Sequence, residues 1–228
     1  MDNSVLLQAM RERHSVRRYL DKPIEHDKVD QLQALIDECN QAGGLHIQLV
    51  LNEPKAFGTG LFSYGQFSGV TNYIAMICRK GEDTTLGYYG EKIVLMAQAM
   101  GLNTCWVALT FSKQKDQYVV LPDEKLVCVV ALGYGENQGV QHPQKKGIEH
   151  YCKTQDDMPE WFRRGMEAAL LAPTAINQQK FEFRLSQGNH VKAVTRKTIL
   201  NPYPKIDLGI AKFHFELGAG KENFIWED

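Results

Sequence analysis

The sequence lacks the features of a membrane or secreted protein. Its longest apolar runs, at 73–78 and 127–132, fall far short of the roughly 20 residues that span a bilayer. The first residues contain no basic segment followed by an apolar stretch, so we expect no secretion signal. The chain is therefore predicted to be a cytoplasmic protein without a membrane partner.

An excess of positive charge is also missing. The 228 residues include 26 lysines and arginines against 27 aspartates and glutamates, for a net charge of −1. A near-neutral chain has no bulk electrostatic attraction to nucleic acid, so we expect no nucleic-acid partner. A chain of this length fits one large domain or two small ones.

Cysteine and glycine motifs are equally scarce. The sequence has five cysteines and no C-x-x-C pair, and most lie in apolar surroundings, which indicates buried thiols in a reducing compartment. His142, His150 and Cys152 have no recognised metal-ligand spacing, and we expect no metal site. No G-x-G-x-x-G motif follows a strand, so a Rossmann site is not predicted.

Hydrophobic periodicity predicts a mixture of helices and strands. Helices are expected over 4–14, 23–43, 84–101, 159–171 and 207–217, with Thr84 or Thr85 as the cap of the third and Gly43-Gly44 as the stop of the second. Strands are expected over 45–51, 72–79, 104–109, 125–132, 181–185, 191–194 and at the C-terminus.

The second part of the chain repeats features of the first. A helix, a short loop and an alternating strand occur over 32–51 and again over 166–185, and Leu-Gly opens the helices at Leu86 and Leu208. This pattern indicates an internal duplication. The alternative is two unrelated units that share only the recurrence of helices and strands.

The segment from Arg13 to Tyr19 carries the first candidate site. In an extended chain Arg13, Ser15 and Arg17 share one face, which offers two guanidinium groups and a hydroxyl to a phosphate. The alternatives are a solvated basic stretch at a helix end and a nucleic-acid-binding arm.

Arg-His-Ser-Val-Arg-Arg-Tyr, followed by a proline, resembles the N-terminal signature of the nitroreductase family. In that family the first arginine and the serine hold the phosphate of FMN, and the second basic residue reaches the N1/O2 edge of the flavin ring. The resemblance places Arg13, His14, Ser15 and Arg17 at the flavin.

Ala-Pro-Thr-Ala-Ile-Asn-Gln-Gln, at 172–179, resembles a second family motif, A-P-S-x-x-N-x-Q, which closes over the flavin. Pro173, Thr174, Asn177 and Gln179 match it, whereas Lys180-Phe181 replaces the usual Pro-Trp. Read without the resemblance, the same letters are a helix stop and a turn.

Two further segments resemble the family. The strand that contains Trp106 resembles a family strand beyond which a backbone N–H points at flavin N5, and here Ala108, Leu109 and Thr110 occupy that place. Trp106 itself is expected to be a packed residue. Lys145 and Lys146 resemble the basic pair that completes the phosphate site; a solvated loop is the alternative.

The resemblance implies an α+β, nitroreductase-like fold with a mostly antiparallel sheet flanked by helices and two related halves, 1–150 and 151–228. Ordinary members build each flavin site from two identical subunits. In this chain the segment with Arg13, Ser15 and Arg17 lies in the first half and the segment with Thr174 and Asn177 lies in the second. The chain therefore resembles single-chain, duplicated members. It is expected to be a pseudo-dimer with one composite FMN site, as a monomer or weak homodimer.

The implied function is that of an FMN-dependent oxidoreductase that takes electrons from NAD(P)H and passes them to an electron-poor small molecule, such as a nitroaromatic or a quinone. No side chain is expected to act as a catalytic acid or base. The alternatives are an FMN-binding protein without turnover, an enzyme that uses reduced FMN for dehalogenation or flavin fragmentation, and a colourless structural or RNA-contacting domain.

Overall fold

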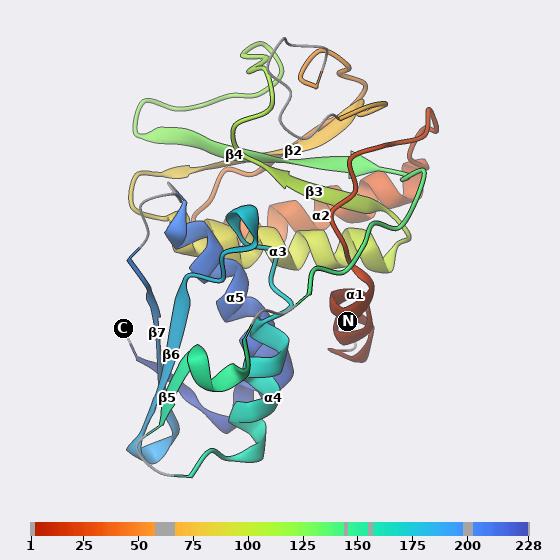
Figure 1. Cartoon of the computed structure of the whole chain (residues 1–228). Helices are drawn as coiled ribbons and strands as arrows, with labels where there is room; N and C mark the ends of the chain where they lie inside the picture. The colour runs from red at the N-terminus through yellow and green to blue at the C-terminus, as the bar shows by residue number, and fades with distance from the viewer. Residues whose placement is uncertain (1–2, 58–66, 144–145, 155–156, 198–202, 228) are drawn as a thin grey trace.

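Two four-stranded sheets lie on opposite sides of a layer of helices in a computed structural model that describes residues 3–57, 67–143, 146–154, 157–197 and 203–227 (Figure 1). The first sheet has the strand order β1-β2-β4-β3 and the second has the order β5-β6-β7-β8. All pairings in the first sheet are antiparallel. In the second, β6 and β7 pair antiparallel, whereas β5 and β8 join their neighbours in parallel.

The strands are β1 (Gln48–Val50), β2 (Asn72–Arg79), β3 (Asn103–Val107), β4 (Glu124–Gly133), β5 (Cys152–Thr154), β6 (Phe181–Ser186), β7 (His190–Thr195) and β8 (Ile225–Glu227). The predicted bounds of β2 are confirmed, and β1 is shorter than predicted. Its expected first part is still buried, because Leu45 and Ile47 pack into the core ahead of the paired residues. Strand β5 is not predicted from the sequence, because three residues are too few to show a period.

The α-helices are α1 (Asn3–Glu12), α2 (His26–Gly43), α3 (Asp83–Ala99), α4 (Glu160–Ala169) and α5 (Pro204–Ala219). Gly44 ends α2 in the left-handed conformation, as its sequence predicts. The predicted cap of α3 is wrong: Glu82 precedes the helix, and Thr84 and Thr85 lie inside its first turn.

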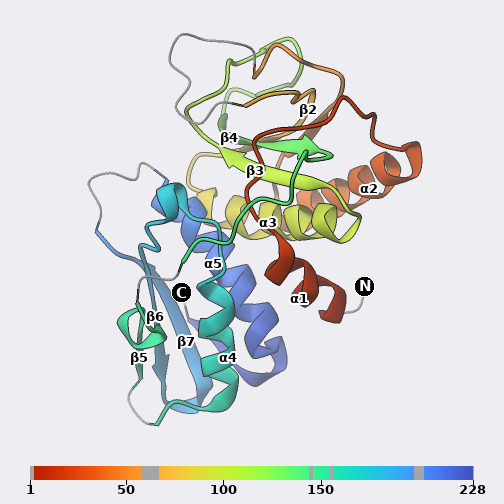
Figure 2. The ribbon, with the colours of Figure 1, turned by 45° about the vertical axis from the view of Figure 1, so that its right-hand side comes forward.

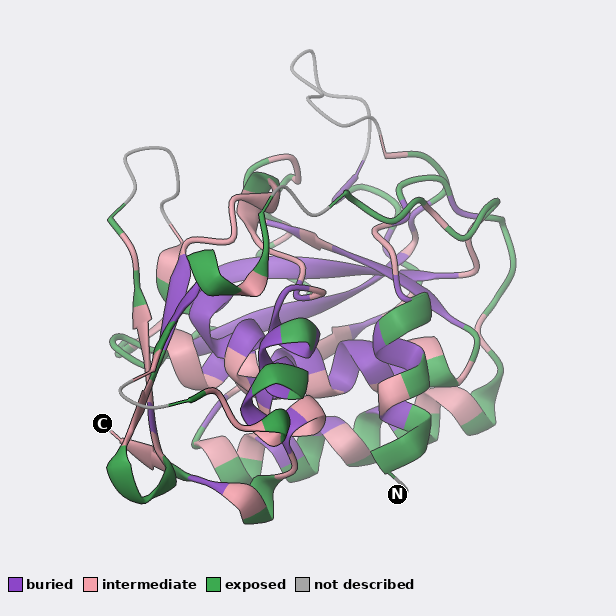
Figure 3. Ribbon diagram, turned by 60° about the horizontal axis from the view of Figure 1, so that its bottom comes forward, coloured by how far each residue is buried: buried purple, intermediate pink, exposed green. Residues whose placement is uncertain are grey.

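The first sheet is buried on both faces, which explains why β2 is apolar along its length. Ile74, Met76 and Cys78 face a core shared with the helices, whereas Tyr73 and Ile77 face a second core on the outer side of the sheet. Figure 3 shows buried segments concentrated in these strands and in the central helices. All five cysteines are buried and unpaired, as expected.

Helices α3 and α5 pack against each other between the two sheets, and α1 lies alongside them (Figure 2). A pair of glycines allows the close approach. A Cβ atom on Gly87 would lie 2.3 Å from the carbonyl oxygen of Ile206, and one on Gly209 would lie 2.0 Å from that of Thr84. Gly87 therefore faces Ile206, three residues before Gly209, and Gly209 faces Thr84, three residues before Gly87. The two contacts are reciprocal, like those across a two-fold axis.

The core joins the two sheets through these helices. A single cluster of buried side chains includes Leu32 and Val130 beside the first sheet and Phe183 and Phe215 beside the second. No helix in the described part of the chain is long and apolar enough to cross a membrane.

Candidate functional site

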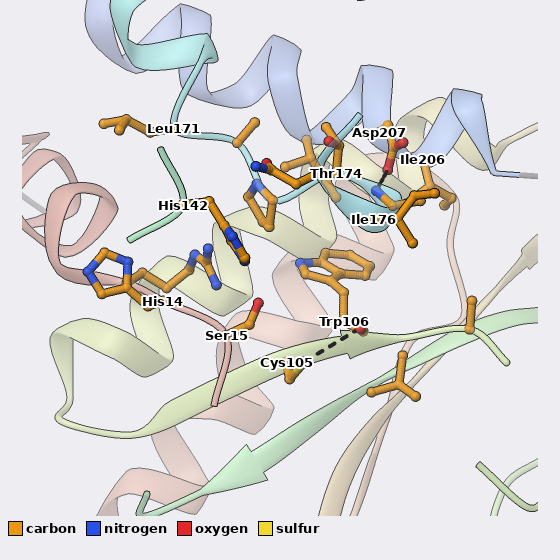
Figure 4. Close-up of a pocket in the computed structure, with 18 of the residues that line it drawn as sticks. His14, Ser15, Cys105, Trp106, His142, Leu171, Thr174, Ile176, Ile206 and Asp207 are labelled. Atoms are coloured by element: carbon orange, nitrogen blue, oxygen red, sulfur yellow. Dashed lines mark hydrogen bonds between the residues drawn. The ribbon is translucent and has the colours of Figure 1, made fainter. Parts of the chain in front are cut away.

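A cavity of about 980 Å³ opens where the first sheet meets the loop after α4. Its walls come from the end of α1 and the chain after it, the end of β3, the segment 140–143, the loop 170–177 and the start of α5. Figure 4 shows His14, Ser15 and Trp106 on one side of this space and Leu171 and Thr174 on the other. The two predicted flavin segments therefore share one cavity.

Arg13 is the buried cation of the cavity. It follows α1, whose last turn it extends through a hydrogen bond from its backbone N–H to the Ala9 carbonyl oxygen at 2.8 Å. Only 7% of the residue is exposed. The Nε and Nη1 atoms of its guanidinium are buried without a hydrogen-bond partner among the described residues. Buried donors of this kind are costly unless a ligand accepts from them.

The chain after Arg13 is extended, as predicted. Ser15 forms a parallel bridge with Thr104 beside β3, and the N–H of Val16 donates to the Thr104 carbonyl oxygen at 3.1 Å. Val16 and Tyr19 pack into the outer core, whereas Ser15 and Arg17 line the cavity. Alternation thus holds from Ser15 to Arg17, whereas Tyr19, which strict alternation would place with Ser15 and Arg17, turns into the core.

The loop after α4 has an unusual backbone. Ile176, Asn177 and Gln179 adopt positive φ angles of 46°, 52° and 50°. Gln179 holds the loop by donating its backbone N–H to Thr174 Oγ1 at 3.0 Å and its side-chain amide to the carbonyl oxygens of Leu170 and Ala172. Gln179 therefore braces the loop from behind, while Pro173, Thr174 and Asn177 line the cavity.

A buried carboxylate supports the same loop from α5. Asp207 is 3% exposed, and its Oδ1 accepts a hydrogen bond from the Ala175 N–H at 3.0 Å (Figure 4). Because Asp207 lies in the first turn of its helix, the helix dipole also favours its negative charge. Helix α5 thus fixes the position of Thr174 and Asn177 in the cavity.

The backbone of Ile176 is strained, and a substitution that removes the strain should stabilise the protein. A β-branched residue with positive φ costs about 1–2 kcal/mol, and Ile176 is 66% exposed, so its side chain recovers little by burial. We expect Ile176→Asn to raise the free energy of unfolding by about 1 kcal/mol, measured by urea denaturation. Ile225→Asn, at a residue that is 58% exposed in β8 with ordinary φ, is the control and should give no gain.

The remaining predicted positions divide into two groups. Ala108, Leu109 and Thr110 line the cavity directly after β3. Lys145 lies outside the described residues. Lys146 is exposed and is not part of the cavity wall; its Nζ lies 3.1 Å from His150 Nε2.

Three titratable groups in the cavity wall, those of His14, Cys105 and Cys128, have pKa values shifted toward their uncharged forms. Burial, together with the charge of Arg13 and the proximity of His142, lowers the pKa of His14 below its usual value of 6.5. Burial raises the pKa of the Cys105 and Cys128 thiols. His14 is therefore a neutral ring at neutral pH, and neither thiol is a ready nucleophile.

Sequence reasoning missed several residues of the site. His142 and Val140 lie in a segment without periodicity, Asp207 looked like an ordinary helix-start acid, and Trp106 was expected only to pack. Glu91, buried directly behind Trp106, was also missed. One signal in the sequence could have found Glu91. Val94 and Leu95 follow it by three and four positions, and this spacing places Glu91 on the apolar, buried face of its helix.

Comparison with known proteins identifies the family. The family model described as "Putative TM nitroreductase" matches residues 5–219. The chain therefore belongs to this nitroreductase family, a family of oxidoreductases. A search of curated proteins found no match.

Three solved structures give a measure of the structural similarity. A protein described as "a putative nitroreductase" from Thermotoga maritima is 23% identical, with 95% of this chain and 84% of that chain covered and a TM-score of 0.61. A "putative NADH dehydrogenase/NAD(P)H nitroreductase" from Bacteroides thetaiotaomicron is 19% identical over 66% of this chain and 96% of its own, with a TM-score of 0.48. A "putative nitroreductase in complex with FMN" from Desulfovibrio desulfuricans is 17% identical over 61% and 91%, with a TM-score of 0.45. The first of these shows that the fold is a nitroreductase fold of the α+β class.

Proposed function

We propose that this chain is an FMN-dependent oxidoreductase that passes electrons from NAD(P)H to an electron-poor small molecule. The observation that carries the proposal is the buried guanidinium of Arg13. Its Nε and Nη1 atoms find no hydrogen-bond partner within the described ranges of the chain, and Arg13 lines the same cavity as Ser15 and the 173–177 loop.

The residues present fit an FMN phosphate. Arg13 offers charge-assisted donors in a site with little water, and Ser15 adds a hydroxyl. Arg17, the next residue of that face, would lie toward the N1/O2 edge of the ring, and the backbone of 108–110 toward N5. His14 would add a neutral donor beside the phosphate, and Thr174 and Asn177 would close the opposite side. Bound FMN supplies the redox chemistry, and these residues bind, orient and shield it.

We propose further that the chain is a pseudo-dimer with halves 1–150 and 151–228. Each half holds one sheet, and the paired contacts of Gly87 and Gly209 are those expected of a two-fold axis between α3 and α5. The cavity takes Arg13 and Ser15 from the first half and Thr174 and Asn177 from the second. Such a division supports one composite FMN site per chain.

The rim of the cavity favours an uncharged, apolar acceptor. Leu109, Val140 and Ile176 come from three separate segments, line the cavity and are 77%, 82% and 66% exposed. Exposed apolar side chains gathered at one mouth mark a binding surface. An aromatic nitro compound or a quinone suits such a surface.

Titration of the purified chain with FMN tests the proposal, with flavin fluorescence and absorbance as the readout. We expect binding of one FMN per chain, followed by NAD(P)H oxidation when a nitroarene or a quinone is added. Two FMN per chain would contradict the composite site. Binding without turnover would identify an FMN-binding protein, and a chain that stays colourless in excess FMN would identify a structural domain.

A further inference from the structure

Behind the cavity wall lies a buried network centred on Glu91. This glutamate of α3 is fully buried, and its carboxylate meets side chains from three other parts of the chain. Oε2 accepts a hydrogen bond from Trp106 Nε1 at 2.9 Å, and Oε1 lies 2.9 Å from His214 Nε2. Arg13 Nε lies 3.9 Å from the same Oε1.

The two short contacts fix the carboxylate. Trp106 approaches Glu91 closely because the preceding residue of α3 is Gly90, where a Cβ atom would lie 2.7 Å from the indole. His214 lies in α5 and is itself fixed, since its Nδ1 is 3.1 Å from the Ala168 carbonyl oxygen. With one oxygen held by each partner, the carboxylate cannot turn to form a closer pair with Arg13.

The contact with Arg13 attracts the guanidinium but leaves its donors free. At 3.9 Å it is an ion pair and not a hydrogen bond, and Arg13 Nε accordingly has no hydrogen-bond partner as far as the structure describes the chain. The attraction between charges falls only slowly with distance in a buried site. Glu91 therefore restrains Arg13 without forming a hydrogen bond to its Nε or Nη1 atom.

The position of His214 decides how the carboxylate faces Arg13. The Ala168 carbonyl oxygen only accepts, so Nδ1 of His214 carries a hydrogen and the ring is held in one orientation. Nε2 of that ring and Nε of Arg13 approach the same oxygen, Oε1 of Glu91, at 2.9 and 3.9 Å. Replacing Glu91 with glutamine keeps the shape of the side chain but removes the carboxylate that attracts Arg13.

We infer that Glu91 is a positioning residue that, held by Trp106 and by His214 of α5, orients the Arg13 guanidinium toward the phosphate of FMN. The inference rests on the proposed FMN site. It implies that the second half of the chain acts on phosphate recognition from a place outside the cavity wall, through His214.

The experiment compares the dissociation constants of FMN and riboflavin, which differ only by the phosphate. We expect Glu91→Gln to lower the ratio of the riboflavin constant to the FMN constant about tenfold, since the orientation of one charge-assisted contact is lost. His214→Asn keeps a donor near the Ala168 carbonyl oxygen but removes the partner of Glu91, and should lower the ratio in the same direction. In an Arg13→Gln background Glu91→Gln should change the ratio no further.

Glu182→Gln is the matched control. Glu182 is a buried carboxylate with two arginine partners in the second sheet, away from the cavity, and its substitution should leave the ratio unchanged. If Glu91→Gln weakens the binding of both flavins equally, or leaves the ratio of their dissociation constants unchanged, Glu91 has no positioning role. If the substitution raises that ratio, Glu91 only neutralises part of the Arg13 charge and does not orient it. Should Glu91→Gln not fold, His214→Asn decides by the same readout. A wild-type chain that does not prefer FMN to riboflavin would instead contradict the proposed phosphate site.

Discussion

Replacement of Arg13 with glutamine is expected to weaken FMN binding about 100-fold. The substitution removes the buried positive charge of the cavity and the Nε and Nη1 donors, which have no hydrogen-bond partner in the part of the chain that the structure describes. A hydrogen bond to a charged group contributes about 1.5–3 kcal/mol, and about 1.4 kcal/mol corresponds to a factor of ten. The measurement is a fluorescence titration with FMN at fixed salt concentration.

Arg11→Gln is the control for this prediction. Arg11 also lines the cavity, two residues earlier, but its side chain is exposed, so water and salt screen its charge. We expect less than about a threefold effect. Riboflavin binding provides a second check, because a loss confined to the phosphate contact leaves it nearly unchanged. Equal losses with both flavins would show that Arg13 supports the fold and not the ligand.

Alanine at Gly87 or Gly209 is expected to lower the free energy of unfolding by about 2–3 kcal/mol. Each new methyl group would press against a carbonyl oxygen of the opposite helix, at 2.3 Å for Gly87 and 2.0 Å for Gly209. Because the clash is with backbone atoms, the two helices must move apart. The free-energy cost of the lost packing outweighs the gain of about 1 kcal/mol that alanine brings to a helix interior. Urea denaturation of each variant measures the loss.

Gly43→Ala is the matched substitution at a helical glycine. A Cβ atom there would meet the ring of Tyr89 at 2.7 Å and a methyl group of Leu45 at 2.9 Å, and these side chains can shift without separating two helix backbones. We expect a change within about 1 kcal/mol. Because Gly87 and Gly209 belong to one helix contact, the double variant should lose less than the sum of the single ones. Additive losses would argue against a shared contact.

The glycine pair also links stability to ligand binding. Helix α5 carries Asp207, which holds the Ala175 N–H, and the same helix carries His214 of the Glu91 network. A displacement of α5 from α3 therefore moves both the loop and the restraint on Arg13. Loss of packing at the glycines should reduce FMN affinity together with stability.

Most of the secondary structure followed from local pattern. The apolar run at 72–79 predicted β2 because a strand buried on both faces needs no alternation. Gly44 ended α2 because it takes the left-handed conformation without cost. Where local signals compete, prediction failed: Thr84 and Thr85 are typical capping residues, but the helix begins at Asp83. Strand β5 forms only because it pairs with β6, and a pattern of three residues is too short to predict that pairing.

The sequence by itself indicated two of the segments that line the cavity: alternation after α1 placed Ser15 and Arg17 together, and a proline with polar residues marked the loop before β6. Only the tertiary structure decided that these segments, more than 150 positions apart, share one cavity. It also decided that Glu91 lies buried between Trp106 and His214, and that Gly87 and Gly209 admit the opposite helix. The physical reason is that burial, close approach and the partners of a charge are properties of two or more segments at once, so no single stretch of sequence contains them.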